Sequence, residues 1–348
     1  MKSVHSLQSL GWRPFFQSQV DIDCGWTPAR VHRVHRGRIQ AAHAGGVATI
    51  VLSGKSASLD ITVGDWVLVD LDGPQVKECL ERFGLFQRKA AGTGGDTQLI
   101  AANVDTLFIV TSANRDFNIA RLERYLAIAH DAGAYPVVVI SKADTVDSVD
   151  EYVAAAKRLS PGLLVEAVDA RKIDSVAVLR PWCETGNTVA LLGSSGVGKS
   201  TLINTLADTK IATRSAREDD QRGRHTTTGR CMHRLPDGGW LIDTPGMREL
   251  QLVDVGNALN EVFCDIADLA KRCRFADCSH ATEPGCAVRL AIEQGELDAG
   301  RLQRFQKLQS EDRRNSESIA ERRSRDRFFG KMYRAIQSDK RQHKGRKT

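Results

Sequence analysis

Residues 193–200 read Gly-Ser-Ser-Gly-Val-Gly-Lys-Ser, and the rest of the chain can be interpreted outward from this stretch. It fits the pattern G-x-x-x-x-G-K-[ST] of a phosphate-binding loop (P-loop). Residues 188–192 read as a short buried strand, and residues 199–207 as the first turns of a helix. The glycines let the backbone wrap around phosphates, to which the helix N-terminus donates free N–H groups. The alternative, a glycine- and serine-rich turn that matches by chance, would not explain both flanks.

The P-loop predicts specific roles for its last residues. Lys199 is expected to reach the β- and γ-phosphates of a nucleotide as a catalytic group, and Ser200 to ligate Mg²⁺. The other residues expected to contact the nucleotide here are Gly193, Ser194, Ser195, Gly196, Val197, Gly198 and Thr201.

The composition indicates an ordinary globular protein. The 348 residues are 41% hydrophobic and 26% charged, enough for two or three domains. No apolar run approaches the roughly 18 residues that span a bilayer, and residues 1–20 do not resemble a secretory signal. We therefore expect a cytoplasmic protein with no membrane partner. In that compartment its eight cysteines argue against a disulfide framework.

Positive charge gathers at the C-terminus. The chain has a net charge of +6, whereas residues 301–348 alone hold 16 Lys/Arg and 6 Asp/Glu. Such a basic tail favours a polyanionic partner, although a solvated tail without a partner is the alternative.

The chain divides into five expected parts. Residues 1–24 form an N-terminal extension of unknown role. Residues 25–88 contain short strands separated by Gly and Pro turns, which predicts a small all-β barrel of the OB-fold type, a fold that often binds oligonucleotides. After a linker at residues 92–96, strands alternate with helices and predict a parallel sheet covered on both faces. The nucleotide-binding domain is assigned to 89–252, a helical domain to 253–310, and the basic tail to 311–348.

A second nucleotide-binding element lies upstream of the P-loop. Ser141-Lys142-Ala143-Asp144 follows a buried strand and resembles the guanine-reading N-K-x-D element of GTPases. The Asp144 carboxylate is suited to accept hydrogen bonds from guanine N1–H and N2–H₂, while the Lys142 stem packs along the base. Because the Ser141 hydroxyl is shorter than the amide of asparagine, we expect a reduced nucleotide affinity. An ordinary polar turn is the alternative interpretation.

Two further elements follow the P-loop. Residues 217–229 are polar and read as a mobile loop in which Thr226 or Thr227 can complete the Mg²⁺ shell. Residues 240–246 read as a strand that ends in D-x-x-G. Asp243 is expected to hold Mg²⁺, and the Gly246 N–H to contact the γ-phosphate. The P-loop, threonine loop and D-x-x-G in this order are a strong signature of a GTPase.

The order of these elements resembles one family specifically. The guanine-reading element comes first in the chain, as in a circularly permuted GTPase, and residues 100–105, 193–200, 225–228 and 243–246 together look like the RsgA/YjeQ family. The resemblance implies a P-loop GTPase domain between an OB-fold barrel and a zinc-binding helical domain. It also implies late action in assembly of the small (30S) ribosomal subunit, with GTP/GDP and 16S rRNA as partners. We expect a monomer.

The group that activates water is less obvious. Met247 occupies the position where Ras-like enzymes carry a water-orienting glutamine, and a thioether cannot orient water. His225 in the mobile loop is the candidate catalytic group, as the resemblance also implies. An exposed loop histidine without a catalytic role is the alternative.

A cluster of metal-binding residues follows the GTPase signature. Three thiols and one imidazole fall within fourteen residues: Cys273, Cys278, His280 and Cys286. Cys₃His is a standard closed shell for structural Zn²⁺, and the family carries a site with this spacing. Chance clustering of reduced cysteines is the alternative. Residues 257–271, 288–294 and 302–308 are expected to form helices around the metal.

These interpretations leave three functions to compare. The first is a GTP hydrolase that acts as an assembly checkpoint on the small subunit and leaves after hydrolysis. The second is a nucleotide-gated RNA-binding scaffold with little hydrolysis, which Ser141 and Met247 leave open. The third is a P-loop kinase or ATPase, against which Asp144 argues.

Overall fold

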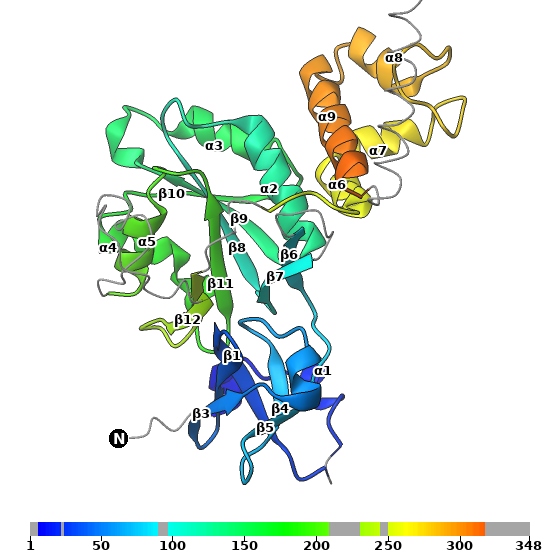
Figure 1. Ribbon diagram of the computed structural model, residues 1–348. Helices are drawn as coiled ribbons and strands as arrows, with labels where there is room; N and C mark the ends of the chain where they lie inside the picture. The colour runs from blue at the N-terminus through cyan, green and yellow to red at the C-terminus, as the bar shows by residue number, and fades with distance from the viewer. Residues whose placement is uncertain (1–5, 22–23, 90–96, 209–229, 244–249, 317–348) are drawn as a thin grey trace, which may run out of the picture.

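The computed structural model describes residues 6–21, 24–89, 97–208, 230–243 and 250–316. Within these residues the chain forms a β-barrel, a central α/β domain and a helical domain, which follow one another from the bottom to the top right of Figure 1. No helix in the described residues is both long enough and apolar enough to cross a membrane.

The elements and their bounds are, in chain order, η1 (Gln8–Leu10), α1 (Pro14–Gln17), β1 (Thr27–His35), β2 (Arg38–His43), β3 (Gly46–Val51), η2 (Gly54–Ser58), β4 (Trp66–Asp70), β5 (Gln75–Cys79), β6 (Leu85–Lys89), β7 (Thr97–Ala102), β8 (Thr106–Ser112), α2 (Ile119–Asp131), β9 (Tyr135–Ser141), η3 (Ala143–Thr145), α3 (Asp150–Lys157), β10 (Leu164–Ala167), α4 (Ile173–Val176), η4 (Ala177–Cys183), β11 (Thr188–Gly193), α5 (Lys199–Leu206), β12 (Arg230–Arg234), β13 (Trp240–Asp243), α6 (Gly256–Val262), α7 (Cys264–Ala270), α8 (Ala287–Glu293) and α9 (Ala299–Ser316).

The barrel is built from β1–β5, and it confirms the expected all-β unit. Strand β1 pairs antiparallel with β2 on one side and with β4 on the other, while β3 and β5 extend the two ends. Its interior is lined by small and branched apolar side chains from alternate positions, which is the pattern that a closed sheet requires. Strand β2 was not expected, because its sequence Arg-Ile-Gln-Ala-Ala-His is short and partly polar.

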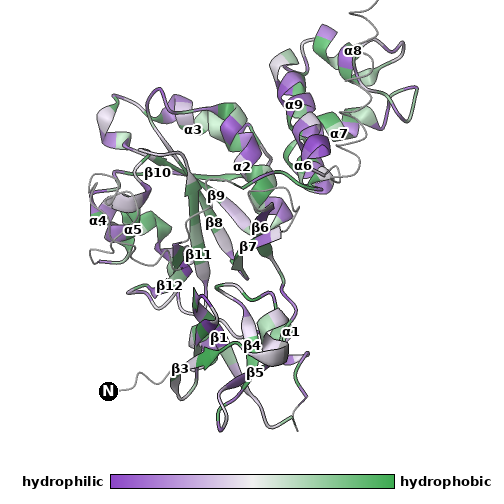
Figure 2. Ribbon diagram, in the orientation of Figure 1, coloured by the Kyte–Doolittle hydropathy of each residue, from purple (hydrophilic) through white to green (hydrophobic). Residues whose placement is uncertain are grey.

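The α/β domain contains the expected parallel sheet. Strands β10, β9, β8, β11 and β13 lie side by side in that order and run parallel. They are rich in Val, Ile and Leu and are largely green in the hydropathy colouring of Figure 2. Helix α2 covers one face, and α4 and α5 the other. Strands β9 and β11 run parallel and are separated only by β8. The two predicted nucleotide elements, which follow these strands in the chain, therefore lie at the same carboxyl-terminal edge of the sheet.

The barrel and the α/β domain share one continuous sheet. Strand β12 pairs antiparallel with β13 on one side and with β1 of the barrel on the other, through Arg33 opposite Cys231 and Val34 opposite Arg230. The β12 strand begins immediately after residues 209–229, which include the expected switch threonines and lie outside the described residues. The barrel is therefore hydrogen-bonded to the strand that leaves this segment.

The expected linker at residues 92–96 lies outside the described residues, but the strands on either side of it pair with each other. Strands β6 and β7 form an antiparallel hairpin, so the expected domain boundary at residues 88 and 89 falls inside β6. Directly after β7, Asn103 adopts a left-handed φ of 55°. Its side-chain oxygen accepts a hydrogen bond from Phe83 N–H, and its side-chain nitrogen donates one to the Gly64 carbonyl. Asn103 therefore joins the hairpin to the barrel.

Part of the N-terminal extension is folded against two domains, and we call residues 6–17 the N-terminal clasp. Phe16 is fully buried and packs against Trp12 and Trp66. The Ser9 carbonyl accepts a hydrogen bond from the Trp240 indole N–H of β13, at 2.8 Å. The Leu10 carbonyl accepts one from Arg30 of β1, at 2.6 Å. This segment thus bonds both the barrel and the α/β domain, a role that its sequence did not reveal.

The helical domain differs from expectation in two places. The expected single helix over 257–271 is two helices, α6 and α7, because Phe263 departs from helical geometry at φ −109° and ψ 44°. Helix α9 runs to Ser316, so the expected start of the tail at residue 311 falls inside it. Most of α9 is hydrophilic, as its purple colour in Figure 2 shows, so the sequence did not indicate the full length of the helix.

Candidate functional site

The P-loop has the geometry of a phosphate cradle. It begins at Gly193, where a Cβ would lie 2.2 Å from the Val110 carbonyl oxygen, so only glycine fits beside β8. Gly196 and Gly198 have φ values of +78° and +93°, which other residues rarely adopt. The buried side chain of Val197 anchors the loop in the core beneath α5.

The ammonium group of Lys199 lies over the mouth of this loop. Its Nζ donates a hydrogen bond to the Gly193 carbonyl at 2.8 Å and another to the Ser194 carbonyl. The ammonium group has three donors, so it can contact phosphate oxygens, as predicted, with its third donor or in place of one of these carbonyls. Ser200 follows in the first turn of α5, and the exposed Thr201 comes next.

The predicted guanine-reading element contacts the P-loop through Ser141. This residue ends β9 and is fully buried. Its Oγ lies 2.5 Å from the Val197 carbonyl oxygen and 2.9 Å from that of Thr111. The contact places the Ser141–Asp144 element beside the P-loop. The hydroxyl is long enough because β9 and the loop lie close: a Cβ on Gly198 would be 3.5 Å from it.

Replacing Ser141 with alanine should weaken GTP binding. The change removes the one O–H donor that ties β9 to the Val197 carbonyl, a bond with a net value of about 1 kcal/mol, or roughly fivefold in the dissociation constant. Asparagine, which the sequence alone favours over serine at this position, should not restore affinity here, because its larger side chain does not fit between β9 and the loop without moving the loop. Titration with a fluorescent GTP analogue measures both variants. The control is Ser148→Ala, and equal affinity of Ser141→Ala and this control would contradict the prediction.

Asp144 lies in the short helix η3 and is paired with an arginine that the sequence analysis did not identify. The Arg171 Nη2 is 2.7 Å from Asp144 Oδ2, and its Nε is 3.1 Å from Asp169 Oδ1. Hydrogen bonds from Arg171 hold the pKa of Asp169 below its usual value. Lys142, which precedes η3, adopts a left-handed φ of 56°. The exposed Arg171 side chain therefore bridges the proposed guanine-reading carboxylate and Asp169.

The loop after β10 lies between this carboxylate and α5. The Val168 carbonyl accepts a hydrogen bond from Ala143 N at 3.3 Å, and the Ala170 carbonyl one from the Thr205 hydroxyl of α5 at 2.7 Å. Residues 168–171 thus contact both nucleotide elements.

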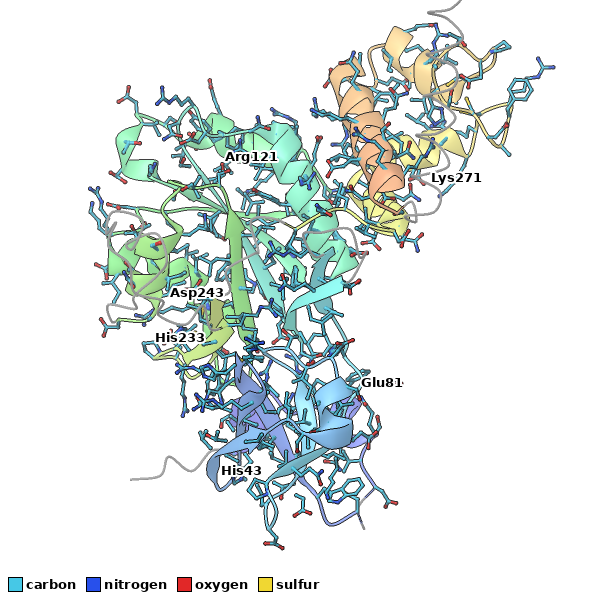
Figure 3. The ribbon with its side chains drawn as sticks, in the orientation of Figure 1. His43, Glu81, Arg121, His233, Asp243 and Lys271 are labelled. Atoms are coloured by element: carbon cyan, nitrogen blue, oxygen red, sulfur yellow. The ribbon has the colours of Figure 1, made fainter. Side chains whose placement is uncertain are left out.

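The two predicted Mg²⁺ ligands lie at one edge of the sheet. Asp243 is the last residue of β13, labelled in Figure 3, and β13 runs parallel to β11, which carries the P-loop. A serine hydroxyl and a carboxylate are oxygen donors of the kind that Mg²⁺ prefers. Opposite Asp243 on β12 lies Cys231, whose Sγ is 3.0 Å from His233 Nε2. Burial raises the pKa of Cys231 and lowers that of His233, so both favour their neutral forms.

Four predicted nucleotide-site residues lie outside the described residues: His225, Thr226, Thr227 and Gly246. Their roles remain predictions from the sequence.

Comparison with known proteins identifies the family. The model of the RsgA GTPase family matches residues 79–253, which is half of the chain. The "Small ribosomal subunit biogenesis GTPase RsgA 2" of Vibrio parahaemolyticus is 50% identical over 345 residues, covering 98% of this chain and 95% of the relative. The chain belongs to the RsgA GTPase family. An RsgA of Mesorhizobium japonicum is 47% identical over 319 residues, covering 90% of this chain and 92% of that protein.

Solved structures support the permuted fold of this RsgA GTPase. YjeQ from Thermotoga maritima matches with a TM-score of 0.62 and 24% identity, covering 81% of this chain and 97% of that one. YloQ, described as a circularly permuted GTPase, matches with a TM-score of 0.61 and 22% identity, covering 86% and 99%. At these identities the likeness concerns the fold, and it agrees with the strand order described above.

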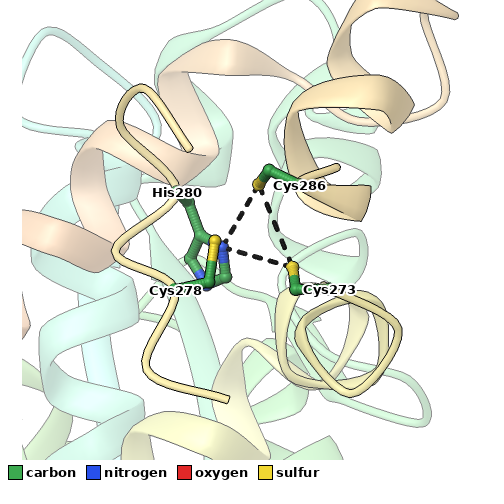
Figure 4. A group of neighbouring side chains, drawn as sticks. All are labelled: Cys273, Cys278, His280 and Cys286. Atoms are coloured by element: carbon green, nitrogen blue, oxygen red, sulfur yellow. Dashed lines mark hydrogen bonds between the residues drawn. The ribbon is translucent and has the colours of Figure 1, made fainter. Parts of the chain in front are cut away.

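The predicted zinc ligands gather at one point of the helical domain (Figure 4). The donor atoms of Cys273, Cys278, His280 and Cys286 all lie within 4.8 Å of one another. The Sγ atoms of Cys273 and Cys286 are 3.9 Å apart and lie 3.7 and 3.5 Å from His280 Nδ1. Tetrahedral Zn²⁺ with its usual bond lengths separates its ligands by about 3.5–3.8 Å. The quoted separations are close to these values, so the four residues fit zinc once the widest pairs, up to 4.8 Å apart, close by about 1 Å.

The ligand loop has a further organiser, Glu283, which the sequence analysis missed. Its carboxylate accepts hydrogen bonds from the backbone N–H of Ser279, Ala281 and Thr282. The hydrogen bonds from Ser279 are the main reason that the pKa of Glu283 falls to about 2. Burial lowers the pKa of His280 and so favours the neutral imidazole that a metal binds. Glu283 thus shapes the turn that presents His280.

Proposed function

We propose that this RsgA-family GTPase acts in assembly of the small ribosomal subunit, binds it through ribosomal RNA, and leaves after GTP hydrolysis. The relatives from Vibrio parahaemolyticus and Mesorhizobium japonicum are both named small ribosomal subunit biogenesis GTPases, and each aligns with at least nine-tenths of this chain. Family membership also excludes the kinase and ATPase alternatives raised by the P-loop alone.

The nucleotide site supports a division of roles in hydrolysis. Asp144 would read guanine, and Lys199 would neutralise charge that develops on the β- and γ-phosphates. Ser200 and Asp243 would hold Mg²⁺, which supplies further charge stabilisation. From the sequence, Thr226 or Thr227 and Gly246 would sense the γ-phosphate, and His225 would activate water. The Cys₃His cluster would hold one structural Zn²⁺, since its four ligands leave no open position for substrate.

The observation that carries the ribosomal part is a basic surface across the junction of barrel and α/β domain. Arg33, Arg36 and Arg38 are exposed on or beside β1 and β2. Arg230 on β12 pairs with the same strand, and its pKa is lowered by burial and by the nearby Arg88 guanidinium. Arginines that crowd together in this way favour the binding of a phosphate backbone.

This surface includes β12, the strand that directly follows the predicted switch threonines in the chain. RNA that binds across β1 and β12 would contact the strand that follows residues 209–229 directly. The bound RNA could then favour one arrangement of the predicted switch threonines over another, which is how a mature subunit would stimulate hydrolysis.

Phosphate release under multiple turnover, measured with and without purified small subunits, tests this function. We expect subunits to raise the rate of phosphate release. The double substitution Arg36→Glu with Arg38→Glu should reduce this stimulation at least tenfold, while the rate without subunits stays unchanged. The matched control, Lys157→Glu with Arg158→Glu on and beside α3, reverses two exposed charges away from the barrel and should behave as wild type. Subunit binding without stimulation would instead support the nucleotide-gated scaffold.

A further inference from the structure

Helix α2 carries three charged residues that connect it to two other parts of the molecule, the P-loop and the helical domain. Arg121, Glu123 and Arg124 all lie in its first half. Arg121, labelled in Figure 3, is in the first turn, at the carboxyl edge of the sheet. Because β8 and β11 are neighbours, the helix that follows β8 begins beside the P-loop that follows β11.

Arg121 contacts the P-loop. Its Nη1 donates a hydrogen bond to the Ser194 hydroxyl. The carbonyl of the same serine accepts a hydrogen bond from Lys199 Nζ. Ser194 is therefore held by two cations, one on its side chain and one on its backbone. The Arg121 contact is made with the Ser194 side chain, so it does not depend on whether Lys199 keeps this carbonyl or turns to the phosphates of GTP.

The other two residues fasten α2 to the helical domain. Glu123 is fully buried, with its carboxylate 3.2 Å from Arg301 Nη1 and 2.7 Å from Arg304 Nε of α9. Arg124 pairs with Glu311 of α9 and donates a hydrogen bond to the Leu250 carbonyl at 3.0 Å. Buried ion pairs of this kind are sensitive to geometry, since a displaced partner leaves a charge without compensation. A shift of α9 must therefore be followed by α2.

We propose that α2 couples the helical domain to the nucleotide site, with Arg121 as the positioning residue that transmits the coupling to the P-loop. A force applied to the helical domain by a bound partner moves α9, then α2 through Glu123, and then the Ser194 end of the loop through Arg121. The proposal rests on the nucleotide site alone, so it stands or falls independently of the ribosomal partner. The physical requirement is an energetic coupling between α9 and the loop.

The first test concerns position 121. Arg121→Ala should weaken GTP binding about tenfold, which corresponds to the loss of one charge-assisted hydrogen bond. Arg121→Lys keeps a donor that reaches Ser194 and should restore most of the affinity. The control Arg115→Ala removes an exposed arginine from the loop before α2 and should bind as wild type. Unchanged affinity in Arg121→Ala, or no rescue by lysine, would overturn the role of Arg121.

The second test measures the coupling itself. Arg304→Ala leaves Glu123 paired with Arg301, so the domain should remain folded while α2 is held less firmly. We expect GTP affinity to fall about threefold in Arg304→Ala, and no further fall when this change is added to Arg121→Ala. The control Lys307→Ala removes an exposed charge from the same helix and should have no effect. Independent, multiplicative effects of the two substitutions, or no effect of Arg304→Ala, would overturn the proposal. Melting curves verify that each variant is folded.

Discussion

Asp144→Asn should reduce the affinity for GTP by at least two orders of magnitude. A carboxylate offers two acceptors to the N1–H and N2–H₂ donors of guanine, whereas the asparagine amide turns one of these acceptors into a donor. That donor then faces the guanine amino group, and both are left without a partner. Sites built to hydrogen-bond a specific group reject a mismatch by factors of about 10⁴ where water is excluded. Asp144 is accessible to water beside Arg171, so we expect a loss of GTP affinity smaller than this factor of about 10⁴ and closer to two orders of magnitude.

The same substitution should change the preferred base of the nucleotide from guanine to xanthine. Xanthine carries a carbonyl where guanine carries the 2-amino group, so the amide donor introduced by Asp144→Asn meets an acceptor. We therefore expect the variant to bind xanthosine triphosphate more tightly than GTP. Competition of both nucleotides against a fluorescent GTP analogue gives the ratio. The control Asp174→Asn removes an exposed carboxylate of α4 and should keep the wild-type preference. An unchanged preference in Asp144→Asn would remove guanine reading from this residue.

This prediction was accessible from the sequence because the nucleotide elements are short and local. Gly193 to Ser200 needs no knowledge of distant residues, since its glycines and flanking strand and helix lie within twenty residues. The same holds for the Cys₃His cluster. The permuted order then followed from the positions of the elements along the chain. That Ser141 reaches the Val197 carbonyl could not be read from the sequence, because it depends on how closely two strand ends approach.

The residues that sequence reasoning missed act across long separations. Arg121 contacts Ser194, and Glu123 contacts Arg301, through side chains more than seventy positions apart. Arg171 has no motif of its own, since any cation of suitable length could pair with Asp144. The N-terminal clasp and the β6–β7 hairpin were missed for a related reason: their apolar residues follow no clear period, and their partners are found only in the folded chain.

Chelation of the proposed zinc should unfold the ligand loop but leave the rest of the helical domain docked. Between the end of α7 at Ala270 and the start of α8 at Ala287, the chain forms no helix or strand, and most of its side chains are exposed. The ligand cluster is thus the main cross-link of this segment. Helices α6 and α9 are held differently, by the contact of Phe263 with Phe305 and by the buried pairs of α9 with Glu123.

Hydrogen exchange before and after chelation distinguishes these two parts. We expect amide protection in residues 271–297 to fall by roughly two orders of magnitude or more, because structural zinc supplies most of the folding free energy of such small segments. Protection of α9 and the affinity for GTP should change by no more than about threefold. The variant Cys286→Ser, which alters the one buried ligand, should reproduce the effect without a chelator, whereas Cys264→Ser lies outside the cluster and serves as the control. Loss of protection throughout α9 would mean that the metal, and not the Glu123 network, holds the helical domain against α2.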